Sequence, residues 1–193
     1  TEPLRYAALP ADLPRGTLTR LFFEAVDRDE PDALLRRGND GWQPVSHRDV
    51  LDQVRTLTHA LQSRCGVRRG DRVALLAENR AEWLLADYAI LGAGALTVPL
   101  YATLPATQLA VILRDCEATV VFVSNAEQLA KMRELQREYG QVEHIIVMED
   151  TAVKGDAIGW RALLDEVRDS RPDEAAFREE ALRAQPDDVA TLI

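Results

Sequence analysis

Gly92 and Gly94 are the first residues that suggest chemistry, because closely spaced glycines let a backbone approach a phosphate. They stand in the stretch ILGAGALTVPLYATLP, residues 90–105. A phosphate-binding loop follows a strand and opens a helix, so that free N–H groups point at the anion. Here a helix-like apolar run precedes the glycines, and Thr97 stands where GxGxxG requires its third glycine. We therefore predict that Gly92 is a left-handed helix C-cap and Gly94 a close-packed turn.

Other reactive side chains do not form a recognisable site in the sequence. The cysteines, Cys65 and Cys116, lack CxxC spacing, which predicts buried and reduced thiols. The histidines, His47, His59 and His144, are scattered and have no second ligand at metal spacing. No serine occupies a GxSxG turn. We therefore assign no catalytic residue and no metal ligand within these 193 residues.

Strand-like and helix-like runs alternate regularly from residue 67 to residue 148. Aliphatic runs predict strands over residues 72–78, 95–101, 118–124 and 142–148. Between them, helices are expected over residues 81–91, 105–114 and 126–139, with Asn79, Pro105 and Asn125 at their starts and Gly140 after the last. This alternation predicts an α/β fold with a mostly parallel sheet and helices on both faces.

The segments that flank this βαβ core have different patterns. Residues 1–16 read as an extended arm, and residues 17–66 as a helix capped by Thr17, a small hairpin and a second helix. Ser46 and Asp49 form a variant capping box for that second helix, and Gly66 ends it. Residues 149–193 are expected to form a loop, a helix from 160 to 167, an acidic surface helix within 172–185 and the start of a strand in PDDVATLI.

Composition excludes some classes of partner. Lys and Arg total 23 against 32 Asp and Glu, a net charge of −9 that argues against nucleic acid. The apolar run 83–101 contains Asp87, two glycines and Pro99, so it is not expected to span a membrane, which requires roughly 20 apolar residues. The first ten residues lack a secretory h-region. We expect a cytoplasmic location, with peripheral contact with a membrane as an open alternative.

Several motifs in fixed order resemble the AMP-forming acyl-CoA synthetases of the adenylate-forming superfamily. ENRAEW at residues 78–83 and VPLYATL at residues 98–104 are similar to the runs that long-chain fatty acid ligases favour. The resemblance covers about residues 15–193 and is to the N-terminal part of these enzymes. One departure is SHRD at residues 46–49, where the family usually has an aromatic residue and then Glu. His47 is expected to be a surface residue at the start of its helix.

The resemblance implies a reaction in two steps: ATP and a fatty acid give an acyl-adenylate and pyrophosphate, and coenzyme A then displaces AMP. It also implies that this chain is an incomplete N-terminal subdomain, because the family's phosphate loop should begin just after Ile193. ATP, Mg²⁺ and coenzyme A would serve the parent enzyme, and none is expected to bind this chain tightly. Its partners would be fatty acid, the remainder of the ligase and a second copy in a homodimer. The alternatives are a fatty acyl-AMP ligase, another acyl-activating enzyme or a non-catalytic α/β binding module.

The resemblance also implies a coenzyme A contact at the end of the strand 95–101. In related synthetases this turn packs on the nucleotide part of coenzyme A, which by position indicates Leu100, Tyr101, Ala102 and Lys131. The Tyr101 ring would stack on adenine, and Lys131 would meet a phosphate as a point charge. The alternative is structural: Tyr101 packs beneath its loop and Lys131 is a solvated helix residue. The apolar helix 83–91 is read as core in preference to an acyl tunnel.

Overall fold

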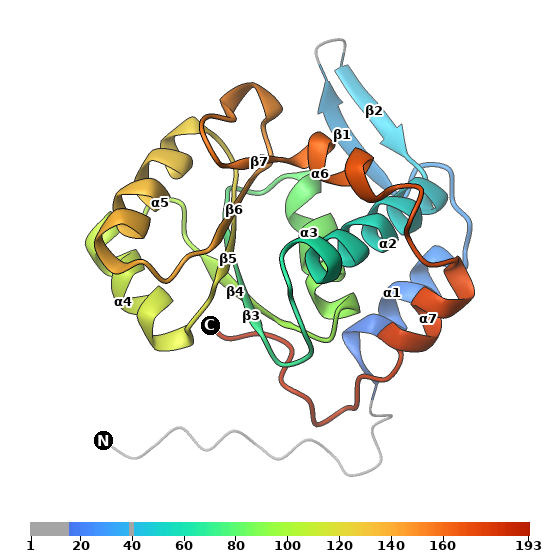
Figure 1. Ribbon diagram of the computed structural model, residues 1–193. Coiled ribbons are helices and arrows are strands. Elements are labelled where there is room, and N and C mark those ends of the chain that lie inside the picture. Colours follow the sequence, from blue (N-terminus) through green and yellow to red (C-terminus); the bar gives the residue numbers. More distant parts are fainter. Residues whose placement is uncertain (1–15, 39–40) are drawn as a thin grey trace, which may run out of the picture.

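The computed structural model describes residues 16–38 and 41–193, and its centre is a five-stranded parallel sheet (Figure 1). The strand order is β4-β3-β5-β6-β7, so the chain moves from β3 to one neighbour and then crosses back to the other. Each pair is parallel, with registers such as Val73 opposite Val120. The strands are β3 (Arg72–Leu76), β4 (Leu96–Leu100), β5 (Val120–Val123), β6 (His144–Val147) and β7 (Ile158–Gly159).

Both faces of the sheet are buried, which explains why the strands read as continuous aliphatic runs. Successive side chains of a strand point to opposite faces. In β3, Val73 and Leu75 join one core cluster, whereas Ala74 and Leu76 join the other. The central residue Phe122 is fully buried and its ring centroid lies 6.0 Å from that of Trp160. The predicted α/β fold with helices on both faces is confirmed.

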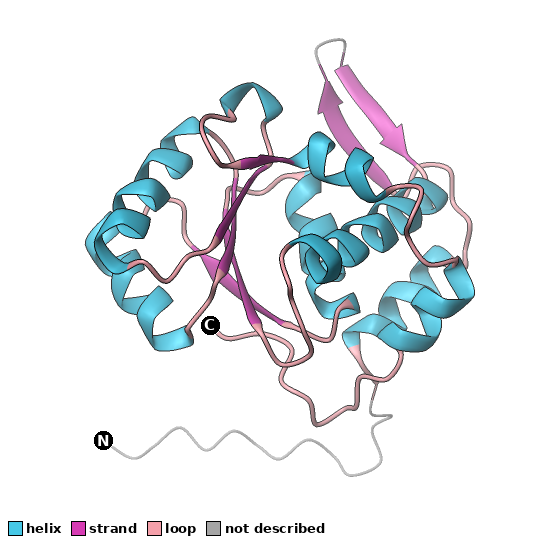
Figure 2. Cartoon of the chain, in the orientation of Figure 1, coloured by secondary structure: helices cyan, strands magenta, loops and turns pink. Residues whose placement is uncertain are grey.

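The helices are divided unequally between the two faces (Figure 2). Two helices, α4 (Ala106–Cys116) and α5 (Ala126–Tyr139), cover one face. The other face is covered by α1 (Leu18–Val26), α2 (His47–Arg64), α3 (Ala81–Gly92), α6 (Trp160–Val167) and α7 (Glu174–Ala181). No helix in the described ranges is both long enough and apolar enough to cross a bilayer.

A separate antiparallel hairpin consists of β1 (Leu34–Gly38) and β2 (Gly41–Val45). It projects from the side of the molecule that carries α2, α3 and α6 (Figure 1). The predicted capping box that follows it is present: Ser46 Oγ accepts from the Asp49 N–H at 3.1 Å, and Asp49 Oδ2 accepts from the Ser46 N–H at 3.3 Å. His47 contributes a further link, because its Nδ1 accepts from the Glu30 N–H at 3.0 Å. The expected arm 1–16, apart from Gly16, and the hairpin turn 39–40 lie outside the described residues.

Four local predictions are corrected by the structure. Asn79 does not cap α3; Arg80 holds the N-cap position without a side-chain cap. Pro105 is itself the N-cap residue of α4, one position before the helix. The expected loop 149–159 contains a short 3₁₀ helix, η1 (Asp150–Ala152), and strand β7. The acidic helix is shorter than predicted and is not only a surface element, because Phe177 is buried.

Gly94 lies in a close-packed turn, as predicted, but the left-handed conformation predicted for Gly92 is found at Gly94. Gly92 is the last residue of α3 and is not its left-handed cap; the C-cap is Ala93, in right-handed conformation. A Cβ at Gly92 would lie 2.9 Å from Thr58 Oγ1, so close packing against α2 explains this glycine. Gly94 instead has the positive φ of +71° and accepts a hydrogen bond from the Gly70 N–H at 2.9 Å. Both positions precede β4 and lie at its amino end, which agrees with the prediction that they do not cradle a phosphate.

We predict that Gly94→Ala lowers the free energy of unfolding by about 1–2 kcal/mol, because an L-residue is disfavoured at this φ. Its Cβ would also lie 2.9 Å from Arg69 Cζ, which has to move. Urea unfolding followed by circular dichroism measures the change. Gly94→Asn is the matched variant and should lose less, since Asn tolerates the left-handed region. An alanine variant as stable as the wild type would contradict this reading.

Candidate functional site

The carboxyl ends of the parallel strands meet at one edge of the sheet, where open α/β sheets bind their ligands. The strand order reverses between β3 and β5, so the crevice beyond these two strands is the expected place for a site. The loops at this edge follow β3 (residues 77–80), β4 (residues 101–105), β5 (residues 124–125) and β6 (residues 148–149). The predicted coenzyme A residues belong to the second loop and to α5.

The residues predicted to contact coenzyme A at the turn after β4 differ in how far they are buried. Leu100 is 4% exposed and packs in the core with α4 and α5, so its side chain is structural. The Tyr101 side chain is 75% exposed and therefore does not pack beneath its loop. The turn is closed by the Leu104 N–H, which donates to the Tyr101 carbonyl at 3.0 Å. Tyr101 is the member of this group whose ring is free to meet a ligand.

Ala102 and Lys131 are brought together through the backbone of the turn. Lys131 Nζ donates to the Ala102 carbonyl at 2.9 Å and lies 3.2 Å from Glu127 Oε1. Gln128 Nε2 donates to the same carbonyl at 3.2 Å. Two side chains of α5 therefore hold the β4–α4 turn, and the Lys131 ammonium is already paired. This arrangement differs from the solvated helix residue that was the structural alternative.

Three polar residues that the sequence analysis did not select lie near this turn. Ser124 and Gln128 are 0% and 2% exposed, and Ser124 Oγ and Gln128 Oε1 have no hydrogen-bond partner among the described residues. The neighbouring Ser124 hydroxyl lowers the pKa of the Glu78 carboxyl below its usual value. The Ser124 hydroxyl and the Glu78 carboxylate do not have the geometry of a full hydrogen bond, so Ser124 Oγ has no hydrogen-bond partner among the described residues. The signal that could have found Ser124 is its position at the end of the apolar run VVFVS.

Arg80 joins three of the loops at this edge. Its Nε donates to Glu82 at 2.9 Å, and its Nη1 donates to the Ser124 carbonyl at 3.2 Å and to Glu149 at 3.3 Å. The guanidinium thus connects the loops after β3, β5 and β6. Because its Nε and Nη1 groups are engaged in these contacts, Arg80 serves as a structural tie at the crevice.

The remaining candidate groups do not add chemistry to the site. Burial raises the pKa of the Cys65 thiol to about 11, and burial likewise raises the pKa of Cys116, so neither is poised as a thiolate. Both cysteines are buried and free, as predicted. Among the described residues, no group of three or more His, Cys, Asp or Glu side chains could hold a metal ion.

The end of the chain lies beside β4, at the edge of the sheet. The Thr97 N–H donates to the Ala190 carbonyl and the Leu192 N–H donates to the Thr97 carbonyl, both at 3.0 Å. Thr191 forms a parallel bridge with Thr97. The predicted start of a strand is therefore an isolated bridge, and its direction leads toward the carboxyl end of β4.

Comparison with known proteins gives a consistent family. The model of the family described as AMP-binding enzyme matches residues 22–193. The long-chain-fatty-acid–CoA ligase FadD15 of Mycobacterium tuberculosis is 36% identical over 137 residues, covering 68% of this chain and 22% of that protein. The long-chain-fatty-acid–CoA ligase ACSBG2 of Xenopus laevis is 30% identical over 141 residues, covering 72% and 19%. The chain thus spans about a fifth of the length of these ligases.

A shorter relative and a solved structure complete the comparison. The uncharacterized protein Rv1549 of M. tuberculosis is 31% identical over 149 residues, which cover 77% of this chain and 82% of that protein. The crystal structure of the anthranilate CoA ligase AuaEII, in complex with anthranoyl-AMP, superposes with a TM-score of 0.69 at 24% identity, covering 93% of this chain and 31% of that one. At this identity the likeness shows a shared fold. Since the family model covers the chain from residue 22 to its end, the chain belongs to the AMP-binding enzyme family.

Proposed function

We propose that the chain is part of a long-chain fatty acid–CoA ligase, which forms acyl-CoA, AMP and pyrophosphate through an acyl-adenylate. The observation that carries this proposal is the 36% identity to a relative named for that activity, over 137 residues that cover 68% of this chain. The substrates would be a fatty acid, ATP and coenzyme A, with Mg²⁺ assisting the first step.

The charged residues at the carboxyl edge support the proposal that another part of such an enzyme carries out the adenylation step. Attack of a carboxylate on the α-phosphorus gathers negative charge, which needs cations and backbone donors. Arg80 is paired with Glu82 and Glu149, and Lys131 is paired with Glu127. We therefore assign the adenylation step to parts of the parent enzyme other than the described residues. The purified 193-residue chain should form no acyl-AMP from ATP and palmitate.

The position of the last residues supports a phosphate loop close to Tyr101. Residues 190–192 run parallel to β4, starting beside Thr97 near its amino end. A strand that continued in this direction would reach the carboxyl edge beside Leu100 and Tyr101. We infer that the family's phosphate loop follows such a strand and faces the β4–α4 turn.

Within that site, we propose that the β4–α4 turn helps to seat coenzyme A. Tyr101 offers an exposed ring for stacking on adenine. The role proposed for Lys131 changes from a phosphate ligand to an anchor of the turn, because its ammonium is bound to the Ala102 carbonyl and Glu127. Gln128 is the second anchor.

Two other functions are the alternatives, and one observation favours the second of them. A fatty acyl-AMP ligase would share the adenylation step and would not consume coenzyme A. A non-catalytic α/β module is favoured by the coverage of the uncharacterized relative Rv1549, 82% of which aligns with this chain. Expression of the complete open reading frame that contains this segment separates the three. A long-chain ligase releases pyrophosphate with palmitate and forms palmitoyl-CoA. Adenylate without palmitoyl-CoA indicates the acyl-AMP ligase, and no pyrophosphate release with long-chain, aryl or amino acids indicates the module.

We predict that Tyr101→Ala in the complete enzyme raises the KM for coenzyme A by about tenfold, because stacking of an aromatic ring on a base is worth about 1–3 kcal/mol. The KM values for ATP and palmitate should stay within about twofold, and Tyr101→Phe, which keeps the ring, should behave as the wild type. Steady-state kinetics measure all three substrates. An unchanged KM for coenzyme A in the alanine variant would remove the stacking role.

We also predict that Lys131→Met loosens the β4–α4 turn, because the Ala102 carbonyl loses one of its two side-chain donors. Amide hydrogen exchange in residues 102–104 should accelerate by about tenfold, while global stability falls by no more than about 1 kcal/mol. Lys154→Met is the matched control, since Lys154 is the only other lysine in the sequence. Equal exchange in both variants would show that Lys131 does not anchor the turn.

A further inference from the structure

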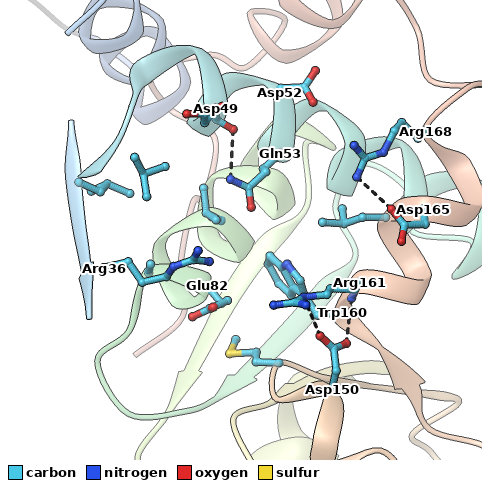
Figure 3. A pocket seen from close by; sticks show the side chains of 16 residues that line it. Arg36, Asp49, Asp52, Gln53, Glu82, Asp150, Trp160, Arg161, Asp165 and Arg168 are labelled. Atoms are coloured by element: carbon cyan, nitrogen blue, oxygen red, sulfur yellow. Dashed lines mark hydrogen bonds and ion pairs between the residues drawn. The ribbon is translucent and has the colours of Figure 1, made fainter. Parts of the chain in front are cut away.

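A cavity of about 380 Å³ lies between the hairpin and helices α2, α3 and α6 (Figure 3). Its volume is within the range of small-molecule sites, which starts near 300 Å³. None of the residues of the proposed coenzyme A contact lines it. It is therefore separate from the β4–α4 turn.

The floor of the cavity is apolar. Leu85, Met148, Trp160 and Leu164 line it and are each at most 6% exposed. Figure 3 shows the Trp160 ring in the middle of the lining side chains, between α3 and α6. Leu34 and Val45 extend this apolar surface onto the hairpin. A ligand that fills the cavity would thus need an apolar body.

The carboxylates on the rim are already occupied. Asp49 belongs to the capping box of α2. The others are in ion pairs: Asp52 with Arg55 at 2.8 Å and Arg171 at 2.7 Å, Glu82 with Arg80 at 2.9 Å, Asp150 with Arg161 at 3.2 Å, and Asp165 with Arg168 at 3.0 Å. Despite the number of acidic residues, the rim therefore has no carboxylate that lacks a partner.

Two donors of the lining have no partner among the described residues. Arg36 is exposed and points into the cavity (Figure 3), and no carboxylate within residues 16–38 and 41–193 forms an ion pair with it. The indole N–H of Trp160 has no hydrogen-bond acceptor in the described part of the chain. An unpaired guanidinium and an unpaired N–H above an apolar floor are complementary to an anion with an apolar body.

We propose that this cavity binds a small amphipathic anion, a carboxylate that carries a short aliphatic or aromatic body. The carboxylate oxygens accept from the Arg36 guanidinium at the hairpin, and the apolar body lies against Trp160 and Leu164. The site is independent of the proposed ligase function, because it shares no residue with the coenzyme A contact and requires no nucleotide.

The hairpin provides a matched control for this site. Arg36 is opposite Gln43 and Arg37 is opposite Trp42, and adjacent strand residues point to opposite faces. Arg36 lines the cavity and Arg37 does not. Arg36→Gln and Arg37→Gln therefore remove the same charge from neighbouring positions, and only the first removes it from the cavity.

The test is a titration of the 193-residue chain with sodium octanoate, followed by the ¹H–¹⁵N signal of the Trp160 indole, which Trp160→Phe identifies. We expect a saturable shift in the wild type. Loss of a charge-assisted hydrogen bond should weaken octanoate binding at least about tenfold in Arg36→Gln, with Arg37→Gln within about twofold of the wild type. Neutral 1-octanol should bind at least about tenfold more weakly than octanoate to the wild type.

Three outcomes would overturn the proposal. The first is no saturable shift of the Trp160 signal with octanoate. The second is equal weakening by Arg36→Gln and Arg37→Gln, which would indicate a general charge effect at the surface. The third is octanol binding as tight as octanoate. Thermal unfolding of each variant verifies that these exposed substitutions leave the fold intact. Because no ATP or coenzyme A is present, failure here leaves the proposed ligase function untouched.

Discussion

Parallel pairing of β3 with both β4 and β5 is the constraint on which the rest of the structure depends. Parallel strands cannot be joined by a tight turn, so each connection crosses over a face of the sheet. The right-handed crossovers bring α3 to one face and α4 and α5 to the other, and the strands become buried on both sides. The same geometry aligns all carboxyl ends at one edge, where short loops can meet.

That edge is held together by polar contacts from few residues. Arg80 ties three loops, and the Ala102 carbonyl is bound by Gln128 and Lys131 from α5. The charged groups of Arg80 and Lys131 are engaged in these contacts. They therefore hold the loops of this edge in place and are not available as free cations. Tyr101 is the large exposed side chain of the β4–α4 turn, and this contrast with its anchored neighbours is why a stacking role is assigned to it.

The sequence predicts the long elements well, because their signals are repeated along many residues. The aliphatic runs of β3 to β6 and the capping box of α2 are found as expected. Two-residue β7 has too few residues for any periodicity, and its pairing with β6 depends on tertiary contacts. The requirement for Gly92 depends on how closely α2 approaches α3, which only the fold determines. Likewise, the family resemblance points to Lys131 as a cation by its position, but it does not show that the charge of Lys131 is already paired.

We propose that the β4–α4 turn and the start of α5 form the coenzyme A side of a ligase site. Amide hydrogen exchange of the complete protein, with and without coenzyme A, tests this most directly. Binding at this edge should protect residues 101–104 and 124–131 and leave the hairpin, residues 34–38 and 41–45, unchanged. Protection that is confined to other parts of the protein, with no change in these two segments, would contradict the claim.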